Sequence, residues 1–294
     1  MKLRWTIVLP ITALLFGCAL LGAPEAERTP EPTEVPATPV VTAVPEETPV
    51  AVAIETATPA AAPTVPPPPT PEPTPTPEPP LYGITIAIDP GHQAKPDYGM
   101  IPLGPDSTEQ TYACTAGTRG IASNVYEYQV NLDVAQKLKA LLEANGATAI
   151  LTRTTNDVNL SQSARAAIIN ESEADLAILL HCNGTDDTSE RGAFMMVPEH
   201  DCTEHFSENT EAADTILASY CAATGIAVHK LPGITYRRDQ ACFNWCTRPV
   251  ICIEMGYLSN ETEDLLLTNA AFQDKMAFGI SEGILTYFNS EATE

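Results

Sequence analysis

Five short apolar runs, each rich in Ile, Val, Leu or Met, are spread along the C-terminal two thirds of the chain. Their residues are apolar almost without interruption rather than in alternation, which is typical of strands that are covered on both faces. We therefore predict buried strands at residues 84–89, 147–152, 176–181, 192–197 and 250–255.

Helical periodicity fills the intervals between and after these strands. The clearest helix is predicted over residues 125–145, where apolar positions recur every three or four residues and Gly146 follows as a C-terminal stop. Further helices are predicted at 160–171, 209–224 and 269–288. Strands that alternate with helices predict an α/β fold of three layers with a mostly parallel sheet.

The extreme N-terminus has the pattern of an export signal. A basic start precedes an apolar run at residues 5–16, which is too short to be a dedicated membrane span. The run closes with LLFGC, which resembles a bacterial lipobox, although Phe16 replaces the usual small residue. This resemblance predicts a lipoprotein signal peptide at 1–17 and lipidation of Cys18. An uncleaved signal anchor and ordinary signal cleavage nearby are the alternatives.

A proline-rich segment follows the predicted lipidation site. Residues 24–80 hold 19 of the 27 prolines and no aromatic residue, so the segment cannot bury enough surface to offset its ordering entropy. We predict that residues 18–80 are a disordered tether. In full polyproline II conformation, at about 3.1 Å per residue, the proline-rich part reaches roughly 170 Å. The remaining residues, 81–294, have the length of one ordinary domain.

The net charge excludes some classes of partner, and the number of cysteines bears on the cellular compartment. With 38 acidic and 15 basic side chains, a net charge of −23 predicts repulsion from nucleic acid and from anionic lipid surfaces. Membrane contact is therefore expected through the N-terminal lipid only. Eight cysteines suit an exported protein in which disulfides form, and Cys242 and Cys246 are close enough in sequence to bridge.

Three residues with metal or acid–base chemistry lie at or near the ends of predicted strands. His92 follows the first strand, His181 closes LAILLH, and Glu254 lies within VICIEM. In open α/β sheets, ligand sites form at the C-terminal ends of the strands. Glu127 begins the apolar stripe of the 125–145 helix, which is an odd place for a carboxylate unless a positive partner lies opposite.

Each of these residues also has an ordinary structural interpretation. Taken alone, His92 is a turn residue and His181 is a core histidine bonded to backbone. Asn124 and Glu127 have the spacing of a capping box. Glu254 is harder to explain, because a buried carboxylate is costly without a partner or a site. Together, two histidines and one carboxylate form a set that leaves zinc one open position for water, with Glu254 as a general base.

Five sequence blocks carry a family resemblance. They are IDPGH (88–92), YEYQVNLDVAQKLKALLEANG (126–146), LTR (151–153), LLHCNG (179–184) and IEMGYLSN (253–260). In the same order and at similar spacings they resemble the zinc-dependent N-acetylmuramoyl-L-alanine amidases of the amidase_3 type, over essentially all of residues 84–288. The resemblance implies a three-layer α/β/α sandwich around a mostly parallel sheet of about six strands, in a catalytic domain at 81–294.

The resemblance also implies a reaction and its residues. It assigns zinc to His92, Glu127 and His181, and catalysis to Glu254. The implied activity is hydrolysis of the amide bond between the muramic acid lactyl group and L-alanine of the peptidoglycan stem peptide. A non-catalytic wall-binding lipoprotein and a zinc peptidase for stem peptides are the alternatives. We expect a monomer outside the cytoplasm, lipid-anchored to the membrane and facing the wall, on a Gram-positive surface.

Two positions depart from the family pattern outside the implied ligands. Gln93 stands where many members have Gly, and Cys182 where Ala is usual, so both bear on local substrate contacts. Cys182 beside His181 also suggests a cysteine hydrolase, but neighbours on a strand point to opposite faces, and we predict a buried thiol instead. The segment 93–123 is long for a connection, and we expect it to wall the zinc site and contact glycan or stem peptide.

Overall fold

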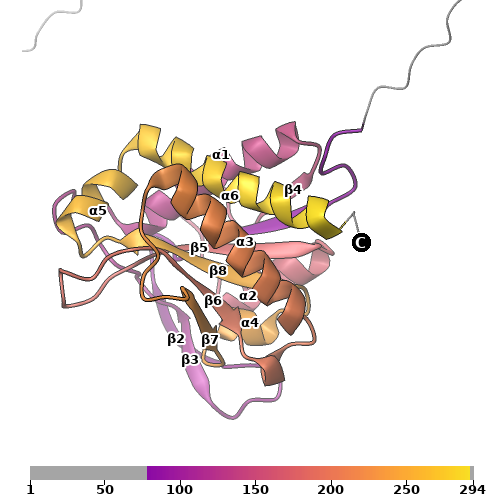
Figure 1. The fold of residues 1–294 in the computed structure, drawn as a ribbon. Helices are drawn as coiled ribbons and strands as arrows, with labels where there is room; N and C mark the ends of the chain where they lie inside the picture. The colour runs from indigo at the N-terminus through magenta and orange to yellow at the C-terminus, as the bar shows by residue number, and fades with distance from the viewer. Residues whose placement is uncertain (1–77, 292–294) are drawn as a thin grey trace, which may run out of the picture. The chain divides into compact units, whose positions relative to one another are not determined.

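A central sheet organises the part of the chain that the computed structural model describes, residues 78–291. Its strands are β1 (Thr85–Pro90), β4 (Thr148–Leu151), β5 (Leu176–Asn183), β6 (Phe194–Pro198), β7 (Ile234–Arg237) and β8 (Val250–Tyr257). They lie in the order β4-β1-β5-β8-β6-β7 (Figure 1). All neighbouring pairs in this sheet are parallel except β6 and β8, which are antiparallel.

Helices cover both faces of this sheet and complete three layers. The larger layer is formed by α1 (Glu127–Ala144), α3 (Phe206–Thr224) and α6 (Ala270–Glu291), and the smaller one by α2 (Gln162–Glu171) and α4 (Ala241–Trp245). The short helices η1 (His200–Cys202) and α5 (Glu261–Leu267) precede α3 and follow β8. A hairpin of β2 (Asp97–Pro102) and β3 (Gln110–Cys114) projects below the sheet in Figure 1.

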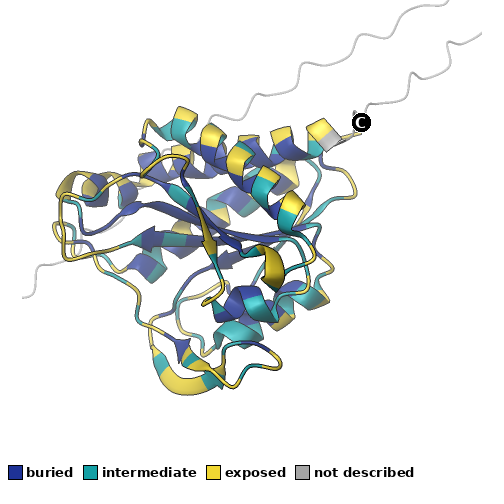
Figure 2. Cartoon of the chain, turned by 60° about the horizontal axis from the view of Figure 1, so that its bottom comes forward, coloured by how far each residue is buried: buried dark blue, intermediate teal, exposed yellow. Residues whose placement is uncertain are grey.

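Alternate residues of the central strands enter two separate apolar cores. In β5, Ile178 and Leu180 belong to the core beneath α1, α3 and α6, whereas Ala177 and Leu179 belong to the core against α2 and α4. The central strands are therefore mostly dark blue in Figure 2, the colour of buried residues, whereas the exposed residues lie on the outer helix surfaces and loops. This double coverage explains why these strands appear in the sequence as continuous apolar runs.

The predicted fold class is confirmed, and the five predicted strands lie within two residues of observed ones. The sequence pattern did not predict β7, the hairpin of β2 and β3, or the antiparallel direction of β6. The seven cysteines in the described range are free thiols, so Cys242 and Cys246 do not bridge in this structure.

The predicted signal peptide, the lipidation site Cys18 and almost all of the tether lie outside the described residues. Between residues 78 and 291, no helix has the length and apolar character needed to cross a membrane.

Candidate metal centre

Three side chains from separate elements meet at the C-terminal edge of the sheet. His92 follows β1, Glu127 is the first residue of α1, and His181 lies near the end of β5. The Nε2 atom of His92 is 3.3 Å from Oε1 of Glu127, and Nδ1 of His181 is 3.0 Å from the same oxygen. Donor atoms of all three residues lie within 4.8 Å of one another, so a single ion could contact all of them.

The two distances from the histidines to Glu127 suit zinc. Tetrahedral zinc with bonds of about 2.0–2.2 Å holds neighbouring ligand atoms roughly 3.3–3.5 Å apart, close to the two distances observed here. Nδ1 of His92 lies 2.9 Å from the carbonyl oxygen of Thr115. If this nitrogen donates its proton there, the lone pair of Nε2 faces Glu127 and the ring is oriented as a ligand.

Backbone groups hold the Glu127 carboxylate in place. The N–H of Thr118 donates to Oε2 at 2.8 Å, and the N–H of Cys182 donates to Oε1 at 3.1 Å. The side-chain amide of Asn131, one helical turn further along α1, donates to Oε1 at 3.3 Å. The carboxylate therefore keeps one orientation, with Oε1 toward both histidines.

The capping-box interpretation of Glu127 is wrong. Helix α1 begins after Tyr126, and Gln129 supplies the reciprocal contact, because its side-chain oxygen accepts the Tyr126 N–H at 3.1 Å. Asn124 lies outside the helix with a φ of 64°. The Glu127 side chain is thus available to the centre.

Two glycines allow the backbone to approach these side chains closely. A Cβ atom on Gly91 would lie 2.2 Å from the ring of His181, and one on Gly117 would lie 2.7 Å from Glu127 and 2.8 Å from His92. Gly117 also has a φ of +73°, a conformation that favours glycine. Larger residues at either position would displace the donor set.

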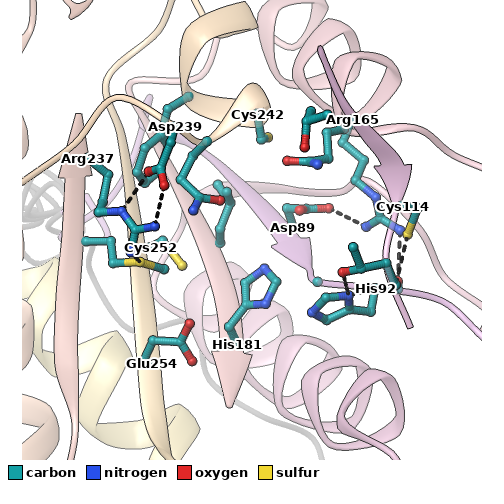
Figure 3. A pocket seen from close by; sticks show the side chains of 18 of the residues that line it. Asp89, His92, Cys114, Arg165, His181, Arg237, Asp239, Cys242, Cys252 and Glu254 are labelled. Atoms are coloured by element: carbon teal, nitrogen blue, oxygen red, sulfur yellow. Dashed lines mark hydrogen bonds and ion pairs between the residues drawn. The ribbon is translucent and has the colours of Figure 1, made fainter. Parts of the chain in front are cut away.

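Glu254 lies directly beside His181, because the two are paired in the register of β5 and β8. Its side chain is buried, and Oε2 has no hydrogen-bond partner among the described residues. Burial, and then the nearby Glu127 carboxylate, raise the pKa of Glu254 well above its usual range. Figure 3 shows its carboxylate pointing toward the space beside the His181 ring. A buried carboxylate of this kind in a cleft is a candidate proton acceptor.

The protonation of the donor set reflects mutual attraction. Burial opposes a charge on His92, but the Glu127 carboxylate and the Thr115 carbonyl raise the pKa of His92 to about 10. Burial likewise opposes the charge on Glu127, yet the two histidines hold the pKa of Glu127 well below its usual range. The arrangement therefore favours positive charge around Glu127, which a metal ion supplies in exchange for protons.

Two cavities adjoin the donor set. A partly enclosed cavity of about 390 Å³ extends along the sheet face that carries α2 and α4. Its lining includes His181, Glu254 and Arg237 (Figure 3), and also Gln162. The second cavity, of about 520 Å³, is more open and includes Tyr98 in its lining. Residues of the 93–123 segment line both cavities, so this segment walls the centre as predicted.

A buried network of charged side chains lies behind His92, and it was not predicted from the sequence. Arg165 donates to the carboxylate of Asp89 at 2.7 Å and to the carbonyls of Pro90 at 3.0 Å and His92 at 2.8 Å. Arg153 donates to the Pro90 carbonyl at 2.8 Å. The signal available in the sequence was the charge of Asp89, which follows three apolar residues near the end of β1. This network fixes the turn in which His92 adopts a φ of 59°.

Gln93 belongs to the same scaffold, contrary to the expectation that it bears on substrate contacts. Its side chain is fully buried, and its Oε1 accepts from the Leu160 N–H at 3.0 Å and from Arg165 at 3.2 Å. Cys182 is a buried thiol, as predicted. Burial raises its pKa well above the usual range, which argues against a cysteine nucleophile.

The family model and two curated relatives that match this chain carry the description N-acetylmuramoyl-L-alanine amidase. Residues 86–286 match the family model described as N-acetylmuramoyl-L-alanine amidase. The germination-specific N-acetylmuramoyl-L-alanine amidase of Bacillus subtilis is 28% identical over 229 residues, covering 72% of this chain and 83% of that protein. The amidase LytC of the same organism is 26% identical over 209 residues, covering 71% of this chain but only 36% of LytC.

Solved structures show the same fold. Ami1, the N-acetylmuramyl-L-alanine amidase of Mycobacterium smegmatis, superposes with a TM-score of 0.67 at 21% identity, covering 71% of this chain and 99% of that one. The catalytic domain of CwlV, an N-acetylmuramoyl-L-alanine amidase from Bacillus (Paenibacillus) polymyxa, superposes with a TM-score of 0.57 at 25% identity, covering 70% of this chain and 98% of that one. Since the family model spans well over half of the sequence, the chain belongs to the N-acetylmuramoyl-L-alanine amidase family.

Proposed function

We propose that this protein is a zinc-dependent N-acetylmuramoyl-L-alanine amidase that cleaves the amide bond between the muramic acid lactyl group and L-alanine in peptidoglycan. The observation that carries the proposal is the convergence of His92, Glu127 and His181 beside Glu254, whose buried Oε2 has no partner among residues 78–291. Membership of the family supports the class of bond, and the donor set supports the metal.

In this mechanism the four residues have distinct roles. His92, Glu127 and His181 would hold the zinc, which would supply a lowered pKa for a water molecule and polarisation of the scissile carbonyl. Glu254 accepts the proton of the attacking water and returns it to the nitrogen of the leaving L-alanine. In the metal-free site, burial raises the pKa of Glu254, which favours proton uptake by this carboxylate.

Product analysis tests the reaction directly. The purified protein, with and without chelator, is incubated with muropeptides, and the products are identified by mass spectrometry. We expect a free L-alanine amino group and intact muramic acid, loss of activity with chelator, and recovery when zinc is restored. Cleavage between amino acids would indicate a stem-peptide peptidase, and wall binding without any product would indicate a binding protein.

Two substitutions separate metal binding from catalysis. Glu254→Gln is expected to keep zinc and lose most hydrolysis, because the amide cannot accept the proton. His181→Ala is expected to lose both, because the donor set is broken. Zinc content measured on the purified variants provides the comparison, and a fully active Glu254→Gln variant would overturn the assignment.

The N-terminal pattern supports a proposed location. The lipobox resemblance supports lipidation of Cys18, and residues 18–80 would then tether the domain above the outer side of the membrane. A wall substrate at that location is consistent with the family. Attachment by lipid alone is consistent with the acidic net charge of −23, which disfavours adhesion to anionic lipid.

A further inference from the structure

The outer face of the β2–β3 hairpin carries a group of large exposed side chains. Tyr98, Met100 and Tyr112 are 57%, 52% and 48% exposed. Met100 and Tyr112 are directly paired across the two strands, and the rings of Tyr98 and Tyr112 meet edge to face with centroids 5.4 Å apart. We call these three residues the tyrosine platform. Apolar side chains that gather on a protein surface commonly mark a contact site.

The platform is continuous with the proposed catalytic centre. Tyr98 lines the more open cavity together with His92, Glu127 and Glu254. A substrate held at the metal site and extending outward along this cavity therefore meets Tyr98 first and the remainder of the platform next.

The hairpin is fixed against the body of the domain. The side-chain amide of Gln162, in α2, donates to the Tyr112 carbonyl at 3.0 Å. The indole N–H of Trp245, in α4, donates to the Pro102 carbonyl at 2.9 Å. The platform is therefore held in a defined position, and binding to it costs less ordering entropy than binding to a loose loop.

The glycan strand and the stem peptide of the substrate differ in shape and charge, and this difference indicates which of them binds the tyrosine platform. A glycan strand continues in both directions from the cleaved branch, so it needs an open surface rather than a partly enclosed cavity. The lactyl carboxyl groups are neutral while they form the amide, whereas stem peptides carry charged groups. The three platform side chains are uncharged, in a protein of net charge −23. Aromatic faces pack against the C–H faces of sugar rings and leave the hydroxyl groups in water.

We propose that the tyrosine platform binds the neutral glycan strand of peptidoglycan next to the sugar whose peptide is removed. This inference rests on the proposed amidase function. It also assigns the partly enclosed cavity of about 390 Å³, with Gln162 and Arg237 in its lining, to the peptide side of the bond.

Binding to glycan without peptides tests the platform independently of catalysis. Zinc-loaded protein is titrated with neutral β-1,4-linked N-acetylglucosamine oligosaccharides, because removal of the stem peptides from peptidoglycan itself leaves charged lactyl carboxylates on the glycan. The double substitution Tyr98→Ala with Tyr112→Ala is expected to weaken binding about tenfold or more, since two ring contacts are lost. Tyr98→Phe is expected to bind like the unchanged protein. Tyr82→Ala, at a tyrosine 66% exposed on the turn before β1, serves as the matched control.

Kinetics separate failure of this inference from failure of the proposed function. For Tyr112→Ala, the ratio of kcat/KM on polymeric peptidoglycan to kcat/KM on a single muramoyl peptide should fall about tenfold, mainly through KM. An unchanged ratio together with unchanged glycan binding would overturn the proposed glycan-binding role of the platform without affecting the proposed amidase function. Weaker binding of free stem peptide, with glycan binding intact, would also overturn it. If the unchanged protein cleaves neither substrate, the proposed function itself fails.

Discussion

At the scale of single residues, Glu254 has opposing effects on stability and function. Its position beside His181 suits a proton acceptor, but a carboxylate buried without a hydrogen-bond partner for Oε2 destabilises the fold when it is charged. Because burial raises the pKa of Glu254, the folded state binds its proton more tightly than the unfolded state does. The stabilising effect is complete below the unfolded pKa and disappears as the pH rises through the folded pKa.

Glu254→Gln should therefore stabilise the metal-free protein at neutral pH. We expect a higher melting temperature than that of the unchanged protein at pH 7–8, and little difference near pH 4. Each kcal/mol gained in unfolding free energy should raise the melting temperature by about 2–4 °C. Thermal unfolding in chelator across this pH range measures it. Glu143→Gln, at an exposed helix position, is the control. The expectation is contradicted if the difference in melting temperature, variant minus unchanged protein, is smaller at pH 8 than at pH 4.

Asp89 shows the opposite pH behaviour. Burial opposes its charge, but Arg165 and Thr152 hold the pKa of Asp89 below its usual value. Its contribution to stability is present above the unfolded pKa, about 3.8, and is lost as the pH falls through the folded pKa. Asp89→Asn leaves a buried guanidinium unpaired and should lower the free energy of unfolding by about 3–5 kcal/mol at pH 7.

Urea unfolding at pH 7 and at progressively lower pH measures this effect. The deficit of Asp89→Asn should shrink as the pH falls below the folded pKa of Asp89. Asp157→Asn, which removes an exposed pair with Lys95, should change stability by no more than about 1 kcal/mol. Equal losses for the two variants would show that the buried pair has no special role.

At the scale of elements, helix α5 holds the turn that leads into α1. The carboxylate of Asp264 accepts from the N–H groups of Ala122 and Ser123 at 2.7 and 2.8 Å. A Cβ on Gly120 would collide with the same carboxylate, so the turn lies tightly against α5. The position of Glu127 at the start of α1 thus depends on a contact with a distant part of the chain.

Asp264→Asn should loosen this connection. We expect a loss of about 2–3 kcal/mol in unfolding free energy, because charged hydrogen bonds to buried backbone are weakened, and weaker zinc binding because Glu127 is less well placed. Hydrogen exchange of residues 118–126 measures the local effect. Asp274→Asn, whose partner is the surface residue Lys137, is the control and should leave that exchange unchanged.

The same scale shows what the sequence can and cannot predict. The central strands were predictable because both of their faces are buried. The β2–β3 hairpin has one exposed face and a register irregularity near Asp97, and β7 has only four residues, so neither produces a clear apolar run. His92, His181 and Glu254 were visible as polar residues at strand ends. Arg165 and Thr118 were not, because Arg165 donates to a carbonyl 73 positions away and Thr118 acts through its backbone N–H, which no residue type reveals.

At the scale of the whole molecule, the candidate site lies entirely within residues 78–291, and the proposed anchor lies entirely before them. Cys18→Ser should therefore move the protein from the membrane fraction to the medium while leaving its amidase activity on muropeptides unchanged. Cell fractionation and labelling with a fatty acid measure this. Cys202→Ser, in a different region, is the control. Persistent membrane attachment of Cys18→Ser would favour an uncleaved signal anchor.

The pairing of His181 with Glu254 in parallel strands also has a consequence for the proposed export of the chain. The four residues of the centre lie far apart along the chain, since Glu127 and His181 alone are separated by 54 positions, and β8 is the last strand to be synthesised. Parallel sheets form late in folding, because long loops must close first. If the chain is exported as proposed, it has no assembled metal site while it crosses the membrane, and hydrolysis would begin only after the complete domain has folded on the far side.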